Sequence, residues 1–186
     1  MYRIMLSAGL MVLALGVALP ASATSIPYQA VLSGLNEVPS NASTATGFAT
    51  VTLNGDSLKV DLSFSGLTNT ASAGHIHCCA PVGVVAIVAV PFTGLPAALS
   101  GTYTNTFDLT LASSYNAAFI TANGGTVASA EAALIAALNS GNAYANIHDS
   151  PNFPNGEIRG QLVAVPEPAT LALVGLGLAA LLARKR

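Results

Sequence analysis

Charged residues are scarce in this chain, and cations are scarcer than anions over most of its length. Asp, Glu, Lys and Arg together make up 8% of the 186 residues. Between residues 24 and 164 the cations are Lys59 and Arg159, against seven carboxylates, so the net charge there is about −5 with neutral histidines. A phosphate backbone is held by clustered Lys and Arg side chains. This composition therefore excludes nucleic acid as an expected partner.

The sequence also lacks the short motifs that mark common enzyme classes. It contains no Gly-rich phosphate loop, no nucleophile elbow, no Cys-x-x-Cys and no His-Glu-x-x-His. Its serines are numerous, and no single serine stands out as a nucleophile. These absences favour a protein without enzymatic activity, but they do not decide whether the chain is an enzyme.

The N-terminal residues, 1–23, have the pattern of a signal peptide. Arg3 precedes an apolar run over residues 4–19, which only Ser7 interrupts, and small residues at 21–23 supply a cleavage site. Between this cleavage site and the C-terminal tail lie residues 24–164, a length that suits one exported domain with its own core.

The last residues, 165–186, form a second targeting segment. Pro166-Glu167-Pro168 is followed by an apolar run over residues 169–183 and by a basic end at residues 184–186. This order resembles the PEP-CTERM sorting signal, which a membrane protease of the exosortase type reads. The resemblance implies export, anchoring in the inner membrane through the tail, and then a surface or extracellular location in a Gram-negative-type bacterium.

The length of the tail agrees with this resemblance. About 15 apolar residues in a helix reach roughly 22 Å, which is short of a bilayer core of about 30 Å. The basic end is expected to stay cytoplasmic, so the rest of the protein lies on the far side of the membrane. A plain C-terminal anchor is the alternative.

Alternation of apolar and polar residues predicts strands through the middle of the chain. Residues 49–53 and 58–64 alternate in this way, with Asn54-Gly55 as the turn of a hairpin between them. Residues 84–90 form a continuous apolar run, so this strand is expected to be covered on both faces. Further strands are expected over residues 28–35, 74–78, 102–111, 143–148 and 157–163.

About eight strands indicate an all-β sandwich or barrel. One short helix is expected over residues 129–139, where Leu134, Ile135 and Leu138 form an apolar stripe. Glu131 favours its first turn and Gly141 can end it. The signal helix and the hydrophobic tail helix flank this fold.

Four separated segments give the middle of the chain a family resemblance. They read Gln-Ala-Val-Leu-Ser-Gly-Leu-Asn-Glu-Val-Pro at 29–39, Gly-His-Ile-His at 74–77, Tyr-Ala-Asn-Ile-His at 144–148 and Phe-Pro-Asn-Gly-Glu-Ile-Arg-Gly-Gln-Leu at 153–162. In this order they resemble the CHRD domain, named for its occurrence in chordin. The resemblance implies an Ig-like or superoxide-dismutase-like Greek-key sandwich, but no settled molecular activity.

The three histidines of the chain fall within two of these segments, 75–77 and 146–148. Residues two apart on a strand share a face, so His75 and His77 point away from the isoleucine between them. If the isoleucines enter the core and the strands are neighbours, His75, His77 and His148 lie close enough to share copper or zinc. The alternative is that these histidines cap strand ends or hydrogen-bond covering loops.

The His-x-His strand is similar to the copper-binding strand of copper-zinc superoxide dismutases. Those enzymes need more histidines than the three of this chain. A passive three-histidine site is therefore expected ahead of redox catalysis.

Cys78-Cys79 directly follows the second of these histidines. Adjacent Cα atoms lie about 3.8 Å apart across a trans peptide, below the usual range of about 4.4–6.8 Å, so a bridge between them is strained. We expect a vicinal disulfide in an oxidising compartment. When reduced, one thiolate would be an accessory ligand that favours Cu(I) or Zn(II). Two partly buried thiols, or a bond between chains, remain alternatives.

Two charges close the last strand of the domain. Glu157 and Arg159 alternate with apolar residues, so they are expected on the outer face, after a tight turn at Asn155-Gly156. Arg159 suits a bidentate carboxylate, either Glu37 or Glu157. We expect a structural ion pair, with a substrate-anion site as the alternative.

Together these patterns predict an exported, surface-sorted module with a binding or structural role in the cell envelope or extracellular matrix. Its expected partners are the sorting protease and extracellular polysaccharide or matrix proteins. The alternative is a copper/zinc metalloprotein with superoxide-dismutase-like redox activity. A third class, a protein-interaction module acting through strand edges or the apolar residues 84–95, needs no metal.

Overall fold

The alternating segments of the sequence fold into antiparallel strands of one curled sheet. The computed structural model of the protein describes residues 25–166. Its strands are β1 (Ile26–Ser33), β2 (Thr46–Asn54), β3 (Ser57–Ser65), β4 (Ala71–Cys78), β5 (Ile87–Pro91), β6 (Gly101–Asp108), β7 (Ala143–Asp149), β8 (Phe153–Gln161) and β9 (Val163–Ala164). Its helices are α1 (Ala117–Ala122), α2 (Val127–Asn139) and the short 3₁₀ turns η1 (Gly34–Asn36) and η2 (Ala112–Ser114).

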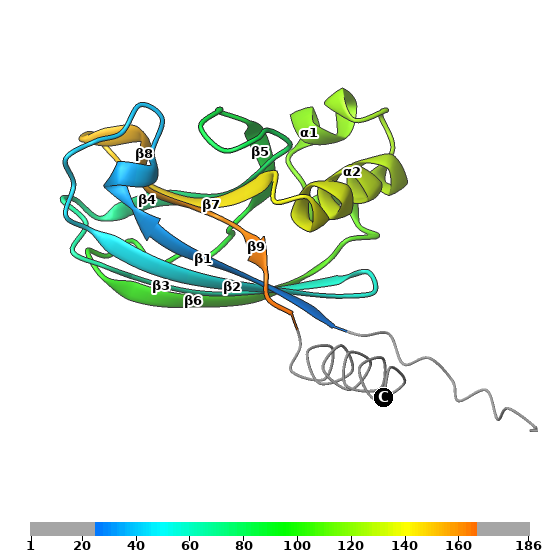
Figure 1. Ribbon diagram of the computed structural model, residues 1–186, viewed down its shortest axis with the longest axis horizontal. Coiled ribbons are helices and arrows are strands. Elements are labelled where there is room, and N and C mark those ends of the chain that lie inside the picture. The colour runs from blue at the N-terminus through cyan, green and yellow to red at the C-terminus, as the bar shows by residue number, and fades with distance from the viewer. Residues whose placement is uncertain (1–24, 167–186) are drawn as a thin grey trace, which may run out of the picture.

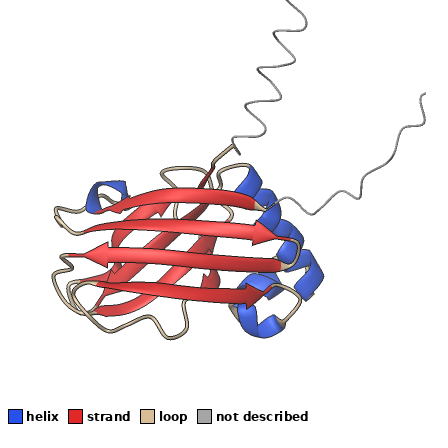
Figure 2. Cartoon of the chain, turned by 90° about the horizontal axis from the view of Figure 1, so that it is seen from below, coloured by secondary structure: helices blue, strands red, loops and turns tan. Residues whose placement is uncertain are grey.

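The sheet curls into two layers. Its strand order is β5-β4-β7-β8-β1-β2-β3-β6, with β9 added beside β1. Figure 1 shows β1, β2, β3 and β6 in one layer and β4, β5, β7 and β8 in the other, and the strands of one layer run side by side in Figure 2. The connections β3–β4, β5–β6 and β6–β7 cross between the layers, as in Greek-key folds. The prediction of an all-β sandwich is confirmed.

The core lies between the layers and is made by alternate residues of each strand. On β3 the side chains of Leu58, Val60, Leu62 and Phe64 are buried, while those between them are exposed or half-buried. The predicted β2–β3 hairpin is present, although its turn is Gly55-Asp56 instead of Asn54-Gly55, because Asn54 pairs with Ser57. Helices α1 and α2 lie at one end of the sandwich (Figure 1).

The predicted helix is present with a different start. α2 begins two residues earlier than expected, because the Thr126 hydroxyl accepts from the Ser129 backbone N–H while the Ser129 hydroxyl contacts the Thr126 backbone N–H in a capping box. No acidic residue lies in its first turn, so the role given to Glu131 was wrong. Helix α1 was not predicted, because its six residues are too few for a periodic stripe.

Two strand predictions were wrong in their extent. β5 starts only at Ile87, and Val84 and Val85 are 47% and 62% exposed instead of covered on both faces. These valines belong to the loop over residues 80–86, whose backbone oxygens at Val84 and Ala86 form hydrogen bonds with Arg159 and His77. Asn155-Gly156 lies inside β8, and the chain turns at residues 150–152.

The predicted signal helix and hydrophobic tail helix lie outside the described residues. None of the helices within residues 25–166 has the length and apolar character needed to cross a bilayer.

The two layers meet where β8 passes β1, and the backbones are close there. Ser33 pairs with Arg159, and a Cβ atom added to Gly160 would lie 2.5 Å from the backbone oxygen of Val31. We therefore expect Gly160→Ala to lower the free energy of unfolding by about 1–3 kcal/mol through overpacking. Urea unfolding, with the exposed Ser63→Ala on β3 as control, measures the change. Equal stability of the two variants would contradict the close approach.

Candidate metal centre

Pairing of β4 with β7 brings the three histidines together. His75 lies opposite Asn146, and His77 lies opposite Tyr144. Ile76 and the isoleucine before His148 are fully buried in the core. The imidazoles therefore share the face that points away from the core, as the alternation predicts.

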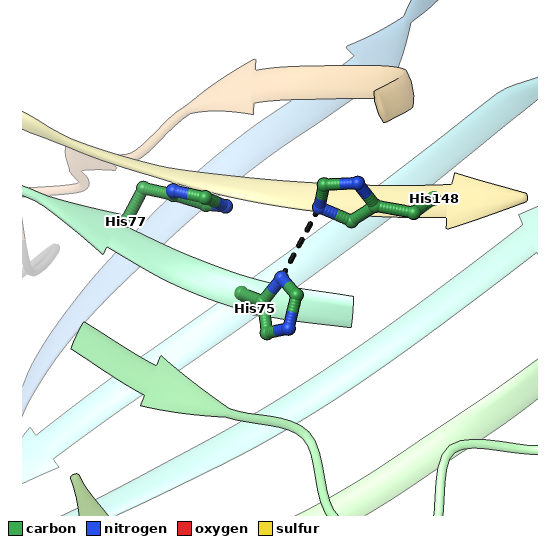
Figure 3. Close-up of side chains that lie close together, drawn as sticks. All are labelled: His75, His77 and His148. Carbon is green, nitrogen blue, oxygen red and sulfur yellow. Dashed lines mark hydrogen bonds between the residues drawn. The ribbon is translucent and has the colours of Figure 1, made fainter. Parts of the chain in front are cut away.

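The three imidazoles converge, as Figure 3 shows. One ligand atom from each of His75, His77 and His148 lies within 4.8 Å of the others. The shortest approach is 3.1 Å, between Nδ1 of His75 and Nε2 of His148. The histidines of this cluster, named here the histidine triad, are close enough to bind one metal ion after small movements of the rings.

Backbone oxygens fix the orientation of two members of the triad. Nδ1 of His77 lies 2.9 Å from the oxygen of Ala86, and Nδ1 of His148 lies 2.9 Å from that of Pro154. A carbonyl oxygen only accepts, so each Nδ1 carries the proton and each Nε2 keeps a lone pair. Histidine ligands of metals are commonly oriented by this kind of outer hydrogen bond.

The lone pairs are available within the cluster. Nε2 of His77 is buried and has no hydrogen-bond partner among residues 25–166. Nε2 of His148 accepts from Nδ1 of His75, a bond that a metal ion would replace. The structure thus presents one buried acceptor without a donor, and the positive charge of a metal would satisfy it.

Burial keeps the triad neutral. It lowers the pKa of His75 to about 4, helped by the neighbouring histidines, and lowers the pKa of His77 to about 4. Burial also lowers the pKa of His148, although the hydrogen bond to Pro154 opposes it. Neutral imidazole is the form that coordinates a metal, so protons compete only weakly near neutral pH.

A column of stacked side chains supports His77 from behind. The rings of His77 and Tyr144 are nearly parallel, 4.7 Å apart, and the guanidinium carbon of Arg159 lies 3.4 Å from the centre of the Tyr144 ring. Each member also holds the loop over residues 80–86: Tyr144 accepts from the Ala86 N–H, and Arg159 donates to the Val84 oxygen. This column of His77, Tyr144 and Arg159 therefore positions both the ring of His77 and the loop over residues 80–86 that covers it.

Comparison of the sequence with models of known protein families finds two matches. A family model described as the CHRD domain matches residues 28–162. The chain belongs to the CHRD domain family. A second model, the PEP-CTERM protein-sorting motif, matches residues 164–186 and indicates export and sorting to the cell envelope by an exosortase-type system. No curated protein and no solved structure matches the chain.

The two cysteines of this CHRD domain lie away from the triad. Cys78 and Cys79 are joined in a disulfide, and both sulfurs approach the backbone oxygen of Ala133 on α2. Cys78 follows His77 on β4 and therefore points to the opposite side, where it is buried in the core. This geometry gives no support to the hypothesis of an accessory thiolate ligand.

The predicted ion pair is not formed. Within residues 25–166 the one ion pair shorter than 4.0 Å joins Lys59 to Asp61. Arg159 instead stacks on Tyr144, while Glu37 accepts from Asn146 at 2.6 Å.

Glu157 is fully buried, not on an outer face. Its carboxylate accepts from the Ser43 hydroxyl at 2.6 Å and the Thr68 N–H at 2.9 Å. Through these hydrogen bonds the carboxylate links the segments that precede β2 and β4 to β8. Sequence patterns gave no signal for these partners, because they are 114 and 89 residues away.

The loop over residues 80–86 was missed as part of the site, and Tyr144 was given no role in it. Tyr144 is two residues from Asn146 on the same strand face, and this spacing was the available signal. Its stacking depends on the pairing of β7 with both β4 and β8, which local sequence does not specify.

Acid is expected to destabilise the metal-free domain through the triad. The unfolded chain takes up protons near the ordinary histidine pKa of 6.5, whereas folded His75 and His77 resist them until about pH 4. Their stabilising contribution is therefore complete above pH 6.5 and is lost as the pH falls toward 4. Urea unfolding across this range, compared with His75→Gln/His77→Gln, measures the effect.

Glu37 acts in the opposite direction and must be removed from the comparison. Burial raises its pKa to about 7, so its contribution is complete below its ordinary pKa of 4.5 and is lost as the pH rises through 7. Both proteins are therefore compared with Glu37→Gln in place. The same pH dependence with and without the two histidines would contradict the prediction.

Proposed function

We propose that this protein is an exported CHRD module that binds one copper or zinc ion through His75, His77 and His148. One observation carries the proposal: one ligand atom from each of the three imidazoles lies within 4.8 Å of the others, while backbone oxygens hold the protons of His77 and His148 on Nδ1. Three neutral nitrogen ligands suit copper and zinc.

The protein side of the site is built before a metal arrives. Ala86 and Pro154 hold the protons of His77 and His148 on Nδ1, and the ring of Tyr144 limits the tilt of His77. A bound ion would supply a positive charge to the three lone pairs and keep a further position open for water or another group. The chain must also turn His75 away from His148 and move the His75 proton from Nδ1 to Nε2, so that Nδ1 offers its lone pair.

The role that fits this arrangement is binding or structural. A metal shared by β4 and β7 would cross-link two strands and the loops that cover them, which stabilises the domain outside the cell. We propose that residues 1–23 are the signal peptide, 24–164 the exported domain and 165–186 the sorting tail held in the inner membrane. Extracellular polysaccharide or matrix proteins are the proposed partners at the surface.

Redox catalysis of superoxide-dismutase type is the second candidate, favoured by the Greek-key sandwich and the half-buried positions of His75 and His148. It requires copper that cycles between two oxidation states with turnover of superoxide. A copper-loaded protein without such turnover leaves the binding role standing.

Metal content is expected to depend on the triad. After loading with copper or zinc and dialysis, the protein should retain about one ion per chain, measured by mass spectrometry. His77→Gln should lower the affinity at least about a hundredfold, because even the loss of an outer hydrogen bond to a ligand costs about 10–100-fold. Cys78→Ser/Cys79→Ser should keep the metal.

Two results would count against this function. A folded wild-type protein that retains neither ion would remove the metal site and the redox candidate together. Equal loss of metal in the histidine and cysteine variants would show that the ligands are not the triad alone.

A further inference from the structure

A groove of about 440 Å³ lies on the far side of the column from the triad. It runs between β1 with the turn η1 and the loop over residues 80–86, and its base is formed by β8. Its volume falls in the range of small-ligand sites. The residues that carry its chemistry are Val31, Leu35, Glu37, Val82, Arg159 and Gln161.

The sides of the groove are apolar and open to solvent. Val31, Leu35 and Val82 are 66%, 78% and 75% exposed. Such residues gather here from three separate segments of the chain, around a polar base. An apolar rim around a polar group is typical of sites for molecules with one polar end.

The base of the groove holds a cation that is not neutralised by an ion pair. Arg159 is 3% exposed, and no carboxylate oxygen of residues 25–166 lies within 4.0 Å of its guanidinium. Lys59, the other cation within residues 25–166, is paired with Asp61 at 2.8 Å. The base therefore has a charge that an anion complements.

The guanidinium also retains free donors. The guanidinium of arginine has five N–H groups, and the one side-chain hydrogen bond of Arg159 within the described residues goes from Nη2 to the Val84 oxygen. None of its nitrogens is both unpartnered and cut off from solvent. Since Arg159 lines the groove, the free N–H groups are reached through it.

Glu37, beside Arg159, does not exclude an anion from the groove. One of its oxygens accepts from the Asn146 amide at 2.6 Å. Burial, opposed by the charge of Arg159, raises its pKa to about 7, so this carboxyl is mainly protonated in mildly acidic solution. A protonated carboxyl donates a hydrogen bond to a second carboxylate.

We propose that this groove binds a small organic monocarboxylate, whose carboxylate pairs with Arg159 and whose apolar chain contacts Val31, Leu35 and Val82. The geometry combines a buried, unneutralised guanidinium with three exposed apolar side chains. This site is separate from the triad and needs no metal.

The test is calorimetric titration of the full, metal-free chain in a mild nonionic detergent, at a pH below the Glu37 value of about 7. The probes are hexanoate, hexanol and hexylammonium. Hexanoate should bind at least about tenfold more tightly than the other two. Arg159 also supports the fold, so the variants are placed at the exposed rim instead.

Val82→Asp and Val82→Asn are the matched pair, because they differ in charge and hardly in shape. Val82→Asp should weaken hexanoate binding about tenfold relative to Val82→Asn, through repulsion between like charges a few ångströms apart. Equal binding of hexanoate and hexanol, equal affinity of the two variants, or no binding of hexanoate to the wild-type protein would overturn the proposal.

Discussion

Burial of Ile76 and Ile147 is the constraint on which the site depends. Both side chains are fully buried, and alternation along β4 and β7 then fixes the imidazoles on the other face. The antiparallel pairing of these strands sets the distance between them. A shift of one residue in this pairing would place imidazoles in the core and isoleucines in the site. The same hydrophobic packing that stabilises the sandwich therefore builds the histidine triad.

A second layer of organisation comes from the column of His77, Tyr144 and Arg159. Its members lie on three adjacent strands, β4, β7 and β8, and each is linked to the loop over residues 80–86. The loop is held by backbone groups, which explains why its valines are free to face solvent. The column separates two places of different chemistry: neutral imidazoles that suit a metal at one end, and a guanidinium beside an apolar rim at the other. A single buried stack thus positions both.

The sequence predicted those features that follow from short-range pattern. Alternation placed the β2–β3 hairpin and the common face of His75 and His77, because a strand fixes side-chain direction every second residue. Alternation did not predict that Arg159 stacks on the ring of Tyr144 instead of pairing with a carboxylate, since its neighbours depend on which strand lies beside β8. It misjudged the valines at 84 and 85 for a related reason: apolar composition does not distinguish a buried strand from a loop that is anchored by its backbone. The family resemblance supplied the topology that periodicity alone could not.

The most direct measurement is an anomalous-diffraction map from crystals of the protein grown with zinc. A metal bound by the triad would give one peak about 2.0–2.1 Å from Nε2 of His77 and Nε2 of His148, with His75 as the third ligand. The hydrogen bonds from Nδ1 of His77 and His148 to Ala86 and Pro154 would remain. A map with no peak between the three rings, while His75 still contacts His148 as in the metal-free protein, would contradict the assignment of this face as a metal site.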